Sequence, residues 1–172
     1  EVLGQRLKVY KNAPPNARAF WLSTADFGPR DYLVYQGERI TYAQAHDQVR
    51  AVAAWLWDQG VRPGDRVAIA MRNYPEWMII YWACLCLGVA AVGMNAWWTA
   101  EELDYALTDS TPKAIFADAE RLARLADCTC PQAKVPTIAV RTDPAAGQVA
   151  WADVIAHPGS LPDVNVDPDA DA

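Results

Sequence analysis

Two groups of aromatic and amide side chains stand where a ligand site is expected. The first contains Asn73, Tyr74 and Trp77, and the second is the segment Met94-Asn-Ala-Trp-Trp98. Each group follows a short apolar run that is typical of a buried strand. Because ligands of open α/β sheets gather at the carboxyl ends of strands, these rings are candidates for lining an apolar trough. The alternative is that they pack against a further part of the sheet.

The sequence contains few side chains that could act as a nucleophile, a general acid or a general base. His46 and His157 have no Cys or Ser beside them in a recognisable dyad, so we interpret both as surface or partly buried histidines. Glu101 and Glu102 are adjacent carboxylates, but a capping box explains Glu102 and the helix dipole explains Glu101. We therefore predict no catalytic residue in this chain.

The charges give no sign of a nucleic-acid or membrane surface. The net charge is −6, and the basic residues are scattered without a run of Lys or Arg, whereas such surfaces need clustered cations. Asp65 and Arg66 stand in a turn before a strand, where a structural role is expected. Arg72 precedes a residue that can cap a helix, and a phosphate or nucleotide contact is the alternative to a structural role there.

The cysteines form two C-x-C pairs, Cys84 with Cys86 and Cys128 with Cys130. Structural zinc sites use a longer spacing, and the first pair falls inside an apolar helix, so we predict reduced thiols and no metal site. Reduced thiols indicate a reducing compartment, and we expect a cytoplasmic protein.

The longest apolar run, Trp77–Leu87, is shorter than the roughly 20 residues of a membrane span, and the first residues show no secretory pattern.

Short strands and helices alternate along the middle of the chain. The expected strands are 66–71, 89–93, 113–117 and 136–140, preceded by a hairpin of 32–35 and 39–41. The expected helices are 41–60, 75–87, 100–108 and 119–125, with a short helix at 19–22 and a helical turn at 151–155. Connections of this length predict an α/β fold, with a mostly parallel sheet flanked by helices.

Local signals mark the ends of these helices. Gly60 and Gly88 supply left-handed stops, and Asp118 opens the helix that follows it. The expected capping pairs are Thr41 with Gln44, Asn73 with Glu76, and Thr99 with Glu102.

The length of 172 residues fits one domain or most of one. With 52% hydrophobic and 21% charged residues, the chain has the composition of a globular protein with a real core. We divide it into an irregular Pro-rich entry at 1–31, an α/β subdomain at 32–157, and a Pro- and Asp-rich loop at 158–172.

Several blocks of sequence, taken in order, resemble the N-terminal region of the adenylate-forming (AMP-binding) superfamily. The opening Val9-Tyr-Lys-Asn-Ala-Pro-Pro looks most like the fatty acyl-CoA ligase branch. The blocks are Arg39-Ile-Thr-Tyr-Ala-Gln, Gly60-Val-Arg-Pro-Gly-Asp, Arg66-Val-Ala-Ile, Asn73-Tyr-Pro-Glu-Trp, Gly88-Val-Ala-Ala-Val and Glu101-Glu-Leu-Asp-Tyr-Ala-Leu-Thr-Asp-Ser. Each block alone is a short motif that occurs in many proteins, but their order and spacing together are typical of this superfamily. The resemblance runs from about Val9 to Ala172.

The resemblance implies a parent enzyme that uses ATP, Mg²⁺ and CoA to convert a medium- or long-chain fatty acid into an acyl-adenylate and then an acyl-CoA thioester. In that family a segment like Val164–Ala172 leads into a Ser/Thr/Gly-rich loop that wraps the ATP phosphates. We therefore expect an incomplete N-terminal subdomain that is inactive by itself and binds no cofactor tightly. The acyl-pocket candidates are Tyr74, Trp77, Met94, Asn95, Trp97 and Trp98.

Two other functions remain open. The enzyme could load another acceptor or acid, such as a carrier-protein thiol, an aryl acid or an amino acid, or the chain could be an interaction module without catalysis. An incomplete sheet would also expose an unpaired edge and apolar helix faces. We therefore expect a homo-oligomer or association with the remainder of the same enzyme.

Overall fold

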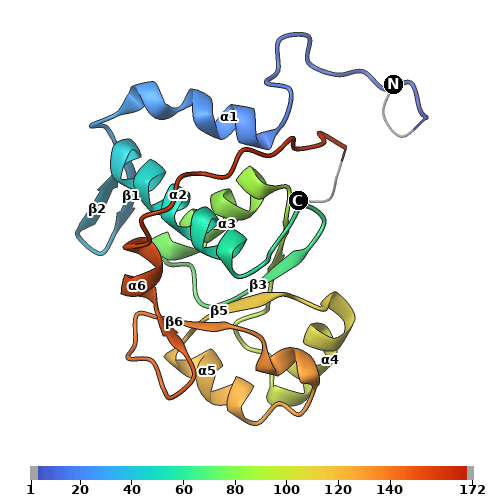
Figure 1. Ribbon diagram of the computed structural model, residues 1–172, viewed down its shortest axis with the longest axis vertical. Helices are drawn as coiled ribbons and strands as arrows, with labels where there is room; N and C mark the ends of the chain where they lie inside the picture. The colour runs from blue at the N-terminus through green and yellow to red at the C-terminus, as the bar shows by residue number, and fades with distance from the viewer. Residues whose placement is uncertain (1–3, 170–172) are drawn as a thin grey trace.

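The computed structural model describes residues 4–169, whose centre is a five-stranded parallel sheet (Figure 1). The strand order is β4-β3-β5-β6-β7, and every neighbouring pair is parallel. The strands are β3 (Arg66–Ala70), β4 (Ala90–Gly93), β5 (Ala114–Asp118), β6 (Thr137–Val140) and β7 (Val149–Ala150). The expected α/β architecture with a mostly parallel sheet is confirmed.

Helices cover both faces of this sheet because its strands are apolar on both sides. On β3, Val67 and Ile69 face one core cluster, whereas Ala68 and Ala70 face the other. The first cluster packs under α2 (Tyr42–Asp58), α3 (Pro75–Leu87) and α6 (Trp151–Ile155), and the second under α4 (Ala100–Ser110) and α5 (Ala119–Ala126).

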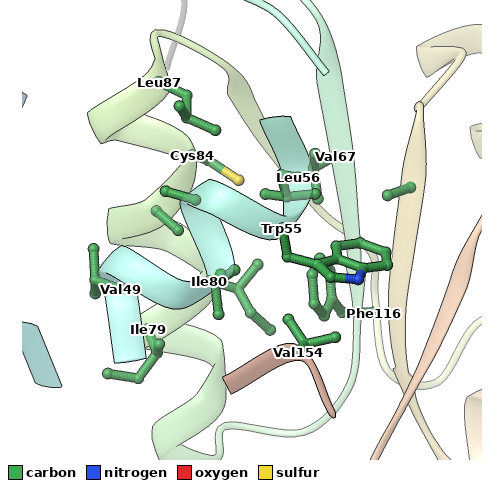
Figure 2. Packing of buried hydrophobic residues seen from close by; sticks show 14 of the residues in the cluster. Val49, Trp55, Leu56, Val67, Ile79, Ile80, Cys84, Leu87, Phe116 and Val154 are labelled. Carbon is green, nitrogen blue, oxygen red and sulfur yellow. The ribbon is translucent and has the colours of Figure 1, made fainter. Parts of the chain in front are cut away.

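The almost wholly apolar helix α3 is buried on several sides. It packs between α2, the sheet and α1 (Ala17–Ser23), and Figure 2 shows Ile79, Ile80 and Cys84 pointing into the layer shared with α2. Among residues 4–169, no helix is long and apolar enough to span a membrane. The apolar surface of α3 is therefore explained by core packing.

A separate antiparallel hairpin, β1 (Asp31–Tyr35) and β2 (Glu38–Thr41), precedes α2. It carries aromatic residues that meet α1 and α3 in one cluster. Trp21 stacks on His46 and on Trp82, with ring centroids 4.3 and 5.0 Å apart, and Tyr32 lies 5.5 Å away. The Thr24 hydroxyl is 3.0 Å from His46 Nε2. This cluster joins α1, the hairpin, α2 and α3.

The stability of the fold is expected to decrease as the pH falls from 7.5 to 5.5, because burial lowers the pKa of His46 below its ordinary value of 6.5 despite the nearby charge of Asp47. The unfolded chain then binds a proton more readily than the folded chain, so the contribution is complete above pH 6.5 and is lost below it. Urea midpoints at the two pH values measure the effect. The variant His46→Gln should lose this part of the pH dependence, and an unchanged slope in that variant would contradict the assignment.

The observed N-caps of the helices agree with the predicted ones at most positions. Two of the three expected capping pairs, at Thr41 and Thr99, form capping boxes, and Asp118 caps α5. The prediction for Asn73 was wrong, because Tyr74 is the N-cap of α3 and makes no side-chain capping bond. Pro75 at the first helical position shifts the start by one residue and needs no hydrogen-bond acceptor for its nitrogen.

Two elements were missed or underestimated. The two-residue strand β7 extends the sheet beyond β6 and is too short to leave a periodic pattern. Helix α1 is longer than the expected 19–22, because Asn16 Oδ1 accepts a hydrogen bond from the Ala19 amide and caps it. A 3₁₀ turn at Ala25–Phe27 follows α1, and another, Pro131–Lys134, precedes β6.

The segment after α6 runs back across α2 and α3 toward α1 (Figure 1). It contains no helix or strand between residues 158 and 169. Arg50 donates to the carbonyl of Gly159, and Asn16 donates to the carbonyl of Val166 over 2.9 Å. The segment is thus attached to the domain at both ends of its path.

Candidate functional site

A cavity of about 640 Å³ opens at the carboxyl ends of β3 and β4. Its walls come from the loops that follow these strands, from Gly93 at the end of β4, from Trp77 on α3 and from Tyr35 of the hairpin. The lining residues are Tyr35, Met71, Arg72, Asn73, Trp77, Gly93, Met94, Asn95, Ala96, Trp97 and Trp98. Five of the six acyl-pocket candidates therefore share one cavity, and their role as acyl contacts stays a prediction.

The sixth candidate, Tyr74, lines a neighbouring cavity of about 410 Å³. Trp77, Tyr35 and Asn73 contribute to both cavities, so Trp77 stands in the wall between them. The two spaces lie side by side along the N-terminal end of α3.

The charge of the larger cavity comes from one side chain. Arg72 lies with its guanidinium carbon 4.7 Å from the centre of the Trp97 ring, a cation–π arrangement. No Asp, Glu, His, Cys, Ser or Lys belongs to the lining residues. The cavity can therefore hold and orient a ligand, but it offers no nucleophile or general base.

A buried ion pair beneath the cavity fixes both of its loops. Asp118 Oδ2 accepts a hydrogen bond from the Arg72 amide over 3.1 Å, and Asp118 Oδ1 accepts one from Arg121 Nη1 over 2.9 Å. Arg121 Nε in turn donates to the carbonyl of Ala96 over 2.9 Å. Asp118 and Arg121 are only 5% and 1% exposed. One carboxylate thus links the loop after β3 to the loop after β4.

A second arginine holds the same loop from the surface of α5. Arg124 Nη1 donates to the carbonyls of Ala96 and Trp98 over 2.8 and 3.0 Å, while its Nη2 pairs with Glu120. Neither Arg121 nor Arg124 was among the residues expected to position a site. The only available signal was an Asp and an Arg three residues apart directly after a buried strand.

The hairpin is fixed beside the smaller cavity by Arg141, directly after β6. Its guanidinium bonds both carboxylate oxygens of Glu38 and both of Glu76, and it lies 5.1 and 5.0 Å from the ring centres of Tyr35 and Tyr74. The hydrogen bonds from Arg141 lower the pKa of the Glu38 carboxyl. Arg141 thereby positions two aromatic residues of the cavities, and sequence reasoning missed it.

The two histidines, Asp65 and Arg66 do not line either of these two cavities. His46 is partly buried in the aromatic cluster, and His157 Nε2 is 3.2 Å from Asp58 on α2. Asp65 accepts from the Arg62 amide, and Arg66 donates to the carbonyl of Ser110. These are contacts within the fold.

All four cysteines are buried free thiols. Burial raises the pKa of Cys86 to about 12 and that of Cys128 to about 11, which keeps both protonated near neutral pH. Within residues 4–169, no group of three or more His, Cys, Asp or Glu side chains is placed to hold a metal ion.

The chain is similar to enzymes that join acids to coenzyme A. It is 35% identical over 96 residues to an oxalate–CoA ligase of Arabidopsis thaliana, covering 55% of this chain and 19% of that protein. It is 30% identical over 100 residues to a medium-chain fatty-acid–CoA ligase of Escherichia coli, covering 57% and 18%. The chain thus spans about a fifth of the length of these curated relatives.

Among solved structures, an anthranilate–CoA ligase in complex with anthranoyl-AMP has the same fold, with a TM-score of 0.81. The match is 21% identical and covers 94% of this chain and 31% of that one. The family model described as AMP-binding enzyme matches residues 20–172. This match covers most of the chain, and the chain therefore belongs to the AMP-binding enzyme family.

Proposed function

We propose that this chain is part of an ATP-dependent acid–CoA ligase that activates a medium- or long-chain fatty acid. The carboxylate attacks the α-phosphorus of ATP and releases pyrophosphate, and the thiol of CoA then displaces AMP to give the thioester. The family match over residues 20–172 is the observation that carries this proposal. The relatives named above, which join acids to CoA, support it.

Within that reaction, we assign to these residues the binding of the acid. The aromatic rings of Trp77, Trp97 and Trp98 surround a space whose size is typical of a small-ligand site. The chain holds no G-x₄-G-K-[ST] phosphate loop, and its described residues offer no cluster for Mg²⁺. We therefore derive no phosphoryl step from these side chains, and we expect that the 172 residues alone do not complete the reaction.

The test is pyrophosphate release in the presence of ATP, Mg²⁺, CoA and a panel of acids. The protein translated from the whole reading frame containing these residues is compared with the 172-residue chain. We expect turnover with octanoate or palmitate by the former and none by the latter. Turnover only with oxalate, anthranilate or an amino acid would replace the fatty acid by that substrate, and no turnover with any acid would contradict the proposed function.

A larger side chain at position 93 is expected to shift the substrate preference toward acids with shorter chains. Gly93 lines the cavity without a positive φ, and a Cβ built on it would lie 3.6 Å from the indole of Trp77. Gly93→Val therefore fills space beside Trp77 without backbone strain. We expect kcat/KM to fall about tenfold for palmitate but little for butyrate. The control is Ala146→Val, in an exposed turn, and an equal loss for both acids in Gly93→Val would contradict this role.

A further inference from the structure

The larger cavity has an electrostatic character opposite to that of the whole chain. The net charge of the protein is −6, yet Arg72 is the one charged residue among those that line this cavity in the described part of the chain. The other polar side-chain groups are uncharged: the amides of Asn73 and Asn95, the hydroxyl of Tyr35 and the indole N–H groups of the three tryptophans. A positive group in such a setting attracts anions and repels cations.

The N–H groups of the Arg72 guanidinium have no polar partner in the described part of the chain, although its carbon lies over the Trp97 ring. Within residues 4–169 the guanidinium forms no hydrogen bond and no ion pair, because both bonds at this residue involve its backbone: the amide donates to Asp118, and the carbonyl accepts from the Tyr74 amide. Eight of the ten other arginines donate from their side chains to a carboxylate, a carbonyl or a hydroxyl oxygen. These arginines are Arg18, Arg39, Arg50, Arg62, Arg66, Arg121, Arg124 and Arg141.

Arg72 is nevertheless held in place. Its backbone amide is bonded to the buried Asp118, and its side chain lies over the Trp97 ring. An arginine that is ordered before binding loses less conformational entropy when it takes a ligand. The planar fork of N–H donors remains available for two oxygens of one anionic group.

We propose that Arg72 forms an anion-binding subsite of the cavity and receives an oxyanion of the ligand. This inference rests on the proposed function, which supplies two ligands of this chemistry: the carboxylate of the acid and the phosphates of a nucleotide. Trp97 holds the guanidinium from one side, and the apolar remainder of the ligand lies against Trp77 and Trp98.

The test compares charged and neutral ligands of the same shape. The 172-residue chain is titrated with octanoate, with octanamide and with inorganic pyrophosphate, and the dissociation constants are obtained from the NMR signals of the Trp97 indole. We expect octanoate to bind about tenfold more tightly than octanamide, as for one charge-assisted bidentate contact. Arg72→Gln should abolish this preference, and Arg72→Lys should retain part of it.

The matched control is Arg30→Gln, which removes another exposed arginine that lies over an aromatic ring, that of Phe27. Pyrophosphate binding that depends on Arg72, without a preference for octanoate, would identify phosphate as the ligand group. Equal binding of both anions to the wild type and Arg72→Gln, or binding of neither anion, would overturn the subsite. Pyrophosphate release by the whole protein decides the proposed function separately, since it can persist when the subsite fails.

Discussion

Replacing Arg121 by alanine is expected to lower the free energy of unfolding by about 3–5 kcal/mol. The substitution leaves the carboxylate of Asp118 buried with its main partner removed, and an unpaired buried charge is costly. It also removes one of the two arginine donors to the carbonyl of Ala96, the other being Arg124. Urea unfolding followed by far-UV circular dichroism measures the loss.

The matched control is Arg39→Ala. Arg39 pairs with Asp31 on the surface of the hairpin, where both side chains are well exposed, so the expected loss is below about 1 kcal/mol. A second variant, Asp118→Leu with Arg121→Met, removes both charges and should recover part of the stability. If Arg39→Ala and Arg121→Ala lowered the free energy of unfolding by similar amounts, the buried pair would contribute no more to stability than the surface pair.

Trp21→Ala is expected to cost about 3–5 kcal/mol as well, because it removes the largest fully buried side chain of the aromatic cluster. Trp21 is 1% exposed and contacts rings from α2, α3 and the hairpin. Its loss leaves a cavity that the surrounding rings fill only partly. The shift in the urea midpoint gives the magnitude, and proteolysis between α1 and β1 should become faster.

Trp97→Ala provides the comparison, since the Trp97 side chain is 71% exposed. Its effect on stability should stay within about 0.5 kcal/mol, as for surface positions away from buried contacts. If both tryptophan variants unfolded at the same urea concentration, the aromatic cluster would not stabilise the attachment of α1 and the hairpin.

Features that depend on nearby residues were predictable from the sequence. The capping boxes at Thr41 and Thr99 need only a partner three residues away, and the αL stop at Gly88 needs only its own backbone freedom. The parallel sheet follows from the alternation of apolar strands and capped helices. The edge where strands end then predicts which loops share a cavity.

Features that depend on distant residues were not predictable. Glu38 and Arg141 are 103 residues apart and meet only because the hairpin packs beside the end of β6. The bonds from Arg121 to Ala96 and from Arg72 to Asp118 cross between neighbouring loops in the same way. A single sequence does not indicate which charged side chain will face which carbonyl. The bonds of Asp118 and Arg121 beneath the cavity are therefore known only from the structure.

The arrangement beneath the cavity separates the residues that hold it from the residues that would touch a ligand. Asp118 and Arg121 hold backbone atoms of the two loops, whereas the amide of Asn73 and the ring of Trp97 project from the same loops. Asn95 is an exception, because its Oδ1 accepts a hydrogen bond from the Trp97 amide. Exchange of Asn73 or Trp97 therefore leaves the backbone bonds of Asp118 and Arg121 in place. Such a division lets the cavity lining change by single substitutions without a matching loss of stability.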